Sequence, residues 1–208
     1  MKRSTLILLK TLAWIAALAP FARLVWGAIQ NQLGPDPTAE IANLTGITAL
    51  WMLTISLAIS PVRKLIPKLS WLIRFRRLAG LFCFFYACVH MLTWIGLYNN
   101  FDLSQMAADL TKRRFIFIGM ATWLLLLPLA LTSTQWAIRK LGGKNWNRLH
   151  SLAYVAAITA LIHYWWKVKT GVLEPLPFTI VMALLLLARP VLAFAQRRKP
   201  RRPVAVQS

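Results

Sequence analysis

The chemistry available to this chain of 208 residues is concentrated in three histidines, His90, His150 and His163. Each lies within or at the edge of a long apolar run. An ionisable side chain at membrane depth is costly to bury, so it suggests a function by default, with helix packing as the alternative. Two neutral imidazoles that face each other across a helical bundle can ligate one iron atom axially, as in a b-type haem.

His90 and His163 are expected at the same depth. His90 follows Arg77 by 13 residues, which corresponds to about 20 Å of helix. His163 follows Arg148 by 15 residues, or about 22 Å. The predicted helices that carry these histidines, residues 78–98 and 149–166, are both expected to start at the cytoplasmic face. The two imidazoles should therefore meet in the outer half of the bilayer. We therefore predict that they are the axial ligands of one haem b iron. A covalently attached c-type haem is excluded because the sequence has no C-x-x-C-H motif.

His150 is expected about 20 Å lower, at the cytoplasmic interface, because it precedes His163 by 13 residues. A second haem at this depth would need a partner ligand near the start of the third predicted helix, residues 78–98. The residue at that depth is Arg77, which is not a histidine. Three interpretations stay open for His150. It is a ligand of a second haem, a hydrogen-bonding contact of a quinone headgroup with Arg77 nearby, or an interfacial histidine that binds nothing.

Other chemistries fit these residues less well. The predicted spans contain no acidic residue, although zinc sites and proton or ion pathways normally need acidic or Cys side chains beside the histidines. Cys83 and Cys88 do not share a helical face, and we interpret them as packing residues. Without a phosphate-binding loop or a dinucleotide fingerprint, the chain is expected to carry no catalytic residue and to act as an electron-transfer subunit.

The composition is typical of an integral membrane protein. Hydrophobic residues make up 58% of the chain, and only 14% of the residues are charged. The 10 Trp, 10 Phe and long aliphatic runs exclude a disordered chain. Two Cys inside one apolar run exclude a disulfide-stapled secreted domain, and runs of this length exclude a soluble nucleic-acid-binding protein.

Six stretches are long and apolar enough to cross about 30 Å of hydrocarbon as helices of about 20 residues. The sequence therefore predicts an all-α, polytopic bundle of six transmembrane helices, forming one haem-binding domain over residues 1–196. A basic, disordered tail is expected at 197–208, and a short amphipathic helix within 99–114. The predicted spans are residues 6–28, 44–62, 78–98, 115–138, 149–166 and 178–196.

The Lys and Arg residues predict the orientation. With a cytoplasmic N-terminus, 19 of the 25 lie on the cytoplasmic side and six lie outside, so both termini are expected in the cytoplasm. The net charge of +20 is then a topology signal and an affinity for anionic lipid, and no sign of nucleic-acid binding. The outer loops at 30–41, 99–114 and 167–174 are the expected docking surface for a partner outside the cytoplasm.

Several segments resemble the ferric reductase-like transmembrane domain superfamily, which includes NADPH oxidases and metalloreductases that pass electrons through haem. The third predicted helix carries RRLAGL at 76–81 and YACVH at 86–90. The fifth carries WNRLHSLAY at 146–154 and IHY at 162–164. Further matching pieces are LTSTQ at 131–135 and WWKVK at 165–169.

Within this superfamily the chain is most similar to the haem-binding membrane subunits of the bacterial periplasmic methionine-sulfoxide reductase system. The resemblance implies a multi-pass protein of the inner membrane, with His90, His150 and His163 at the family's histidine positions. It implies that electrons come from the quinone pool or a cytoplasmic flavin donor. They would leave to a periplasmic molybdopterin-dependent reductase that repairs methionine sulfoxide. Flavin mononucleotide (FMN) is implied by the resemblance alone.

One departure from the wider superfamily is that the third predicted helix has a single histidine where two are usual, which puts a second bis-histidine haem in doubt. Two other functions also stay open. One is a ferric or cupric reductase-type cytochrome b. The other is a redox-silent membrane scaffold or small permease whose histidines only pack helices.

Overall fold

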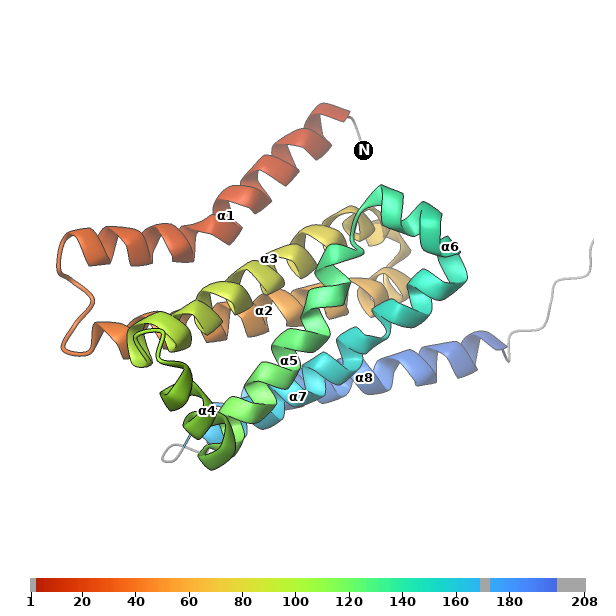
Figure 1. Ribbon diagram of the computed structural model, residues 1–208. Helices are drawn as coiled ribbons and strands as arrows, with labels where there is room; N and C mark the ends of the chain where they lie inside the picture. The colour runs from red at the N-terminus through yellow and green to blue at the C-terminus, as the bar shows by residue number, and fades with distance from the viewer. Residues whose placement is uncertain (1–2, 169–172, 198–208) are drawn as a thin grey trace, which may run out of the picture.

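The computed structural model describes residues 3–168 and 173–197, and these form helices joined by short turns (Figure 1), as the all-α prediction required. Part of the expected tail, residues 198–208, lies outside the described residues. A 3₁₀ segment, Pro67–Leu72, leads into α3, and a π-helical segment, Thr93–Tyr98, continues it. The α-helices are α1 Arg3–Ile29, α2 Pro37–Leu65, α3 Ile73–Leu92, α4 Leu103–Lys112, α5 Arg114–Leu131, α6 Gln135–His150, α7 Leu152–Lys167 and α8 Leu176–Arg197.

Two closely packed helix pairs form the centre of the bundle. The most extensive contacts are those of α2 with α3 and of α5 with α7, and α8 packs against α2 and α7 (Figure 1). Leu57 of α2 and Cys83 of α3 are buried in the core that these helices share. Ala156 and Ala157 of α7 are fully buried there, because small side chains let helix backbones approach closely. The two pairs are the elements that position His90 and His163.

Helix α1 lies apart from the rest of the bundle over much of its length (Figure 1) and is held by a tyrosine. Pro20 interrupts its backbone ladder, and the fully buried Tyr86 of α3 enters the gap. The Tyr86 hydroxyl donates to the Ala17 carbonyl at 2.6 Å and accepts from the Phe21 amide at 3.2 Å. The backbone groups that the proline separates are thus satisfied by a side chain from a neighbouring helix.

The helices indicate a multi-pass membrane protein. Among the described residues, four helical segments are long and apolar enough to cross a membrane: Arg3–Ile29, Pro37–Leu65, Pro67–Tyr98 and Arg114–Leu131. Helix α7 has 16 residues and α8 has 22, and they match the fifth and sixth predicted spans in position. The count of six spans therefore stays a prediction, as does the cytoplasmic placement of both termini.

The fourth predicted span, 115–138, was wrong at its C-terminal end, because α5 stops at Leu131. The Thr132 hydroxyl donates to the Pro128 carbonyl at 2.6 Å, satisfying one of the last carbonyls of the helix. Thr134 then caps α6, accepting the Ala137 amide on its hydroxyl at 3.1 Å. Two helices therefore occupy the stretch that the apolar pattern read as one.

The short amphipathic helix expected within 99–114 is confirmed as α4, Leu103–Lys112. Its N-cap is Asp102, whose carboxylate accepts the amides of Ser104 and Gln105 at 2.8 and 3.2 Å. Helix α4 lies across one end of the bundle, between α3 and α5 (Figure 1).

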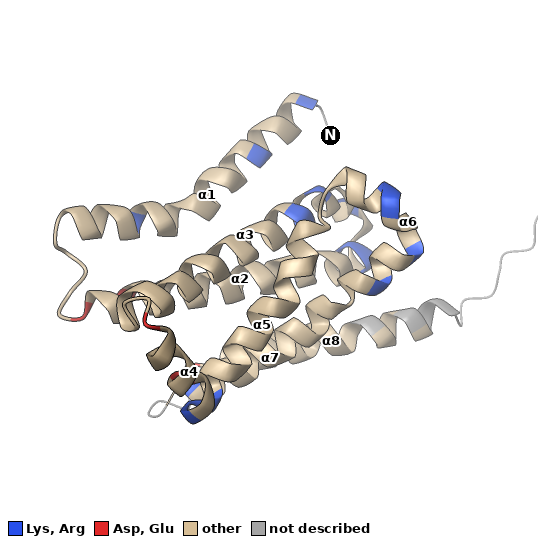
Figure 2. Cartoon of the chain, viewed as in Figure 1, with Lys and Arg blue, Asp and Glu red and all other residues tan. Residues whose placement is uncertain are grey.

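Charge divides the molecule into two ends. Figure 2 shows the acidic residues at the end that carries α4, whereas Lys and Arg gather mainly at the opposite end, around α6 and the start of α3. We name the first the outer end and the second the inner end, after the predicted orientation. The acidic residues are Asp36, Glu40, Asp102, Asp109 and Glu174. This division agrees in direction with the excess of cations that predicted the cytoplasmic side.

Candidate functional site

The structure brings His90 and His163 together, as the depth argument predicted. The centres of their rings are 6.0 Å apart, and the ring planes cross at 86°. His90 comes from α3 and His163 from α7, so each of the two central helix pairs contributes one imidazole. The two rings face each other across the space between the pairs.

Each of these rings is held by a backbone carbonyl from the helix that pairs with its own. His90 Nδ1 lies 2.9 Å from the carbonyl oxygen of Ala42 in α2, and His163 Nδ1 lies 2.6 Å from that of Phe115 in α5. A carbonyl oxygen can only accept a hydrogen bond, so Nδ1 carries the proton in both rings. Each Nε2 therefore keeps its lone pair. This arrangement is typical of a metal-ligating histidine oriented by its surroundings.

Two glycines give the rings their positions. A Cβ atom added to Gly46 of α2 would lie 3.1 Å from the nearest atom of the His90 ring. A Cβ atom added to Gly119 of α5 would lie only 2.7 Å from His163 Nδ1, closer than real contacts allow. Each histidine thus occupies the space where the facing helix has no side chain.

A cavity of about 1460 Å³ surrounds the histidine pair, lined by residues of α2, α3, α5 and α7. It is larger than the roughly 300–1,000 Å³ of most small-molecule pockets, so a porphyrin can be accommodated. Its lining is apolar toward the inner end, where Leu50, Leu53, Cys83 and Leu126 contribute. Lys and Arg line it at the outer end.

The spacing of the rings fits a porphyrin iron. A metal–imidazole bond is about 2 Å long and a ring nitrogen lies roughly 1 Å from the ring centre, so two imidazoles on one metal have centres about 6 Å apart. Residues 3–168 and 173–197 contain no group of three or more His, Cys, Asp or Glu side chains that could hold a bare metal ion. Two axial histidines are enough where a macrocycle supplies the equatorial ligands.

His150 has a different environment, at the inner end of the molecule. Its ring stacks on Trp146 with centres 3.8 Å apart, and its Nε2 lies 3.1 Å from Thr132 Oγ1. Because the Thr132 hydroxyl already donates its proton to the Pro128 carbonyl, it accepts here, and His150 carries its proton on Nε2. The nitrogen that is unprotonated in the outer pair is therefore a donor in His150.

His150 ends α6, outside the four long apolar segments. Burial, and after it the positive charge of Arg76, lower the pKa of His150 below its ordinary value. The sequence predicted Arg77 as the cation near His150. The cation that acts on this ring is instead Arg76, the residue before Arg77. No second histidine faces His150 among the described ring contacts.

The two cysteines take packing positions. Cys83 is buried in the central core, and Cys88 accepts a hydrogen bond from the Trp123 indole on its sulfur at 3.4 Å. Both are unpaired, and their surroundings agree with the interpretation of them as packing residues.

Comparison with known proteins identifies the family. The chain is 44% identical to the protein-methionine-sulfoxide reductase heme-binding subunit MsrQ of Herminiimonas arsenicoxydans, over 93% of this chain and 89% of that protein. It is also 44% identical to MsrQ of Xanthomonas oryzae pv. oryzae, over 88% of this chain and 86% of the relative. Residues 45–161 match the family described as ferric reductase like transmembrane component. The chain belongs to this family, in its MsrQ branch.

The family match runs from α2 to α7 and includes His90 and His150, and it ends two residues before His163. The MsrQ relatives align over most of the chain beyond it. The family match therefore includes one histidine of the outer pair, His90, and does not reach the other.

Sequence reasoning missed the residues that orient the histidines. Ala42 and Phe115 act through backbone carbonyls, which no side-chain pattern reports. Gly46 and Gly119 had a weak signal, since each is a glycine inside a predicted span, where glycine often marks a close approach between helices. Which side chain comes close could not be read from that signal.

Proposed function

We propose that the chain is a membrane electron-transfer subunit that binds one b-type haem through His90 and His163. The observation that carries the proposal is the paired geometry, two imidazoles with centres 6.0 Å apart, each with Nδ1 at a backbone carbonyl. The names of the MsrQ relatives as heme-binding subunits support it. The iron supplies one-electron chemistry when bound. The residues of this chain orient the ligands and enclose the macrocycle in an apolar site.

For the electron path, we propose entry from the quinone pool or a cytoplasmic flavin donor. Exit is to a periplasmic molybdopterin-dependent reductase that repairs methionine sulfoxide. The MsrQ relatives are named as subunits of a methionine-sulfoxide reductase, which supports an acceptor of this kind. The histidine pair lies toward the outer end, which supports an acceptor that docks there if the predicted orientation holds. FMN binding rests on the family resemblance alone.

Two arrangements of the inner end remain part of the proposal. His150 either contacts a quinone headgroup, with Arg76 and Arg77 nearby, or takes part in a second haem site. The hydrogen bond from its Nε2 to Thr132 takes up the nitrogen that is free in the outer pair, and no second histidine faces this ring among the described ring contacts, so of the two arrangements we favour the quinone contact.

A second candidate function is that of a ferric or cupric reductase-type cytochrome b. The match to the ferric reductase like transmembrane component favours it. Co-purification with a periplasmic molybdoenzyme, and electron transfer to it from the reduced protein, would separate the two functions. Reduction of external ferric or cupric chelates without such a partner would favour the second. A redox-silent scaffold would purify without a Soret band.

The central test is the optical spectrum of histidine variants. His90→Ala and His163→Ala should each abolish the low-spin bis-imidazole spectrum, because each removes one axial ligand. His150→Ala is the matched comparison, since it removes the same side chain outside the cavity; it should keep the bis-imidazole signal of the outer pair and instead alter haem content partially, or quinol oxidation. A bis-imidazole spectrum that survives in both outer variants would rule out this ligand pair.

The proposed orientation is open to a direct test. A C-terminal fusion to green fluorescent protein should fluoresce and a C-terminal fusion to alkaline phosphatase should be inactive, because both termini are expected in the cytoplasm of a bacterium. The opposite pattern would place the outer end in the cytoplasm and would contradict the proposed electron path.

A further inference from the structure

The positive charges of the outer end gather at the mouth of the cavity. Outer loops of a membrane protein normally carry few Lys and Arg. The described residues have five at this end, and four of them, Lys112, Arg113, Arg114 and Lys167, line the cavity, while Arg23 lies elsewhere on α1. A concentration of cations where the positive-inside rule disfavours them calls for an anionic partner.

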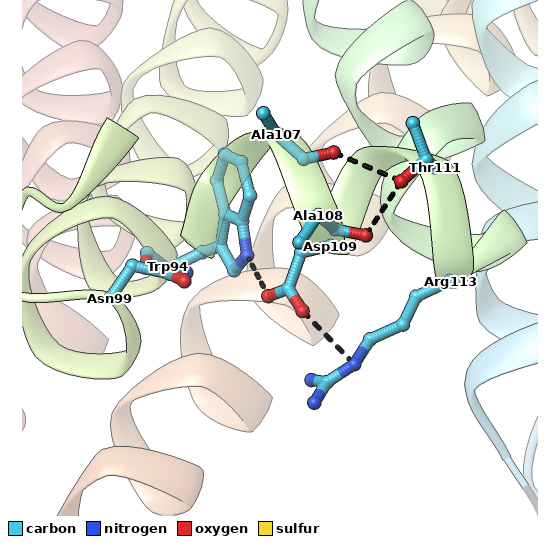
Figure 3. A network of polar contacts seen from close by, with 7 residues as sticks. All are labelled: Trp94, Asn99, Ala107, Ala108, Asp109, Thr111 and Arg113. Carbon is cyan, nitrogen blue, oxygen red and sulfur yellow. Dashed lines mark hydrogen bonds and ion pairs between the residues drawn. The ribbon is translucent and has the colours of Figure 1, made fainter. Parts of the chain in front are cut away.

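One of the four is already paired, and its pairing fixes the junction between α4 and α5. Figure 3 shows the Asp109 carboxylate between Trp94 and Arg113. It accepts the Trp94 indole N–H at 3.2 Å and pairs with Arg113 Nε at 3.1 Å. The Trp94 carbonyl in turn accepts the Asn99 side-chain amide at 2.9 Å. This network holds in place the turn from which Lys112 and Arg114 extend.

Lys112 and Arg114 have no carboxylate within ion-pair distance in the part of the chain that the structure describes. Glu174 is the single carboxylate among the described lining residues. The cavity mouth therefore has a clear excess of positive charge. An anion that enters it would find cationic partners that no acidic side chain has neutralised.

Lys167 belongs to the helix that carries His163. It is the last residue of α7, one helical turn beyond His163. Its ammonium group donates a hydrogen bond to the side-chain carbonyl of Asn43, the residue after the Ala42 that holds His90. Lys167 thus spans from the helix of one ligand to the helix that orients the other.

The cavity has the polarity of a haem. An iron protoporphyrin is an apolar disc that carries two propionate carboxylates on one edge. The inner part of the cavity is lined by Leu50, Leu53 and Leu126, where an unpaired carboxylate would be strongly disfavoured. Among the described residues that line the cavity, the Lys and Arg donors all stand at the outer mouth.

We propose that Lys167, Arg114 and Lys112 form a carboxylate-binding rim that takes the two porphyrin propionates and turns that edge of the haem toward the outer end. The inference rests on the proposed haem site and adds the orientation of the macrocycle and the residues that set it. The rim also holds the acidic groups of the haem at the face where electrons leave. The same cations could bind the phosphate of an outer-leaflet lipid, and the test below separates the two ligands.

The test reconstitutes the detergent-solubilised, haem-depleted protein with haem b and with haem b dimethyl ester, whose propionates carry no charge. The readout is retention of each pigment against transfer to excess apomyoglobin, followed by the bis-imidazole spectrum. The wild type should retain haem b about tenfold more tightly than the ester, the effect expected of one charge-assisted hydrogen bond. Lys167→Met should reduce this ratio several-fold, with Arg114→Gln acting in the same direction.

Arg23→Gln is the matched control, because it removes an outer positive charge that does not line the cavity and pairs with Glu40. It should leave the ratio of haem to ester unchanged. Equal retention of haem and ester by the wild type would overturn the rim, and this is also the result expected if the cations bind lipid phosphate. A Lys167→Met variant that loses both pigments equally would also overturn the rim. A protein that forms no bis-imidazole spectrum with either pigment would instead overturn the proposed haem site itself.

Discussion

The outer histidine pair and the inner histidine differ in how the protein holds an imidazole. In the outer pair each Nδ1 meets a backbone carbonyl, and each ring edge lies against a glycine. In the inner site His150 stacks flat on Trp146 and directs Nε2 to the Thr132 hydroxyl. The outer arrangement leaves Nε2 unprotonated in rings that line a cavity, while the inner arrangement uses Nε2 as a donor. This difference is why we propose the outer pair as the iron ligands: each ring has its proton fixed on Nδ1 and lines a cavity.

Gly119→Ala should have the largest effect on the outer site. The added Cβ would lie 2.7 Å from His163 Nδ1, so the ring must shift away from the Phe115 carbonyl. Overpacking of this kind costs about 1–3 kcal/mol, and we expect haem affinity to fall at least about tenfold. The measurement is the Soret absorbance per protein under limiting haem. Gly80→Ala on α3 is the matched control, because its added Cβ would lie 3.6 Å from Ser56 Oγ, an ordinary contact.

Gly46→Ala should have a smaller effect at the same site. Its Cβ would lie 3.1 Å from the His90 ring, a contact that a shift of a few tenths of an ångström relieves. We expect haem affinity to fall by about two- to fivefold, in proportion to the milder overlap. Haem titration of the two glycine variants side by side gives the order. A loss in Gly46→Ala as large as in Gly119→Ala would show that the two rings are not held by matching contacts.

Thr132→Val should disturb the inner histidine and leave the outer pair intact. The change removes the acceptor of His150 Nε2, which lies 3.1 Å away, and a hydrogen bond of this kind contributes about 1 kcal/mol to stability. Thermal unfolding in detergent should show this loss, while the bis-imidazole spectrum stays unchanged. Ser133→Ala, which removes a hydroxyl bonded to the Leu129 carbonyl, controls for general weakening of the helix end. A changed spectrum in Thr132→Val would mean that the inner histidine is also an iron ligand.

The smallest expected effect is a pH dependence of the inner end. Burial and Arg76 lower the pKa of His150 in the folded protein, so the unfolded chain binds the proton more readily. Stability attributable to this group is complete above the ordinary histidine pKa near 6.5 and falls as the pH drops below it. Unfolding temperatures between about pH 5 and pH 7.5 should therefore decline less steeply in His150→Gln than in the wild type. Parallel curves for the two proteins would contradict this assignment.

The sequence predicted the arrangement better at the outer site than at the inner end. The equal depth of His90 and His163 followed from counting residues, and the structure places their rings 6.0 Å apart. The break between α5 and α6 was missed because 115–138 reads as one apolar run, and hydropathy does not register the Thr side chains that end one helix and cap the next. The amphipathic α4 was found because its apolar spacing is a local property.

Residue order alone determined that this chain is a helical membrane protein with two histidines at one height, because hydropathy and the rise of about 1.5 Å per residue act along a single helix. The tertiary structure decided which way each imidazole points and which of its nitrogens carries the proton. It also decided that the glycines stand opposite the rings and that the outer cations converge on one cavity. These features depend on how helices rotate and pack against one another, and contacts between distant segments set that rotation.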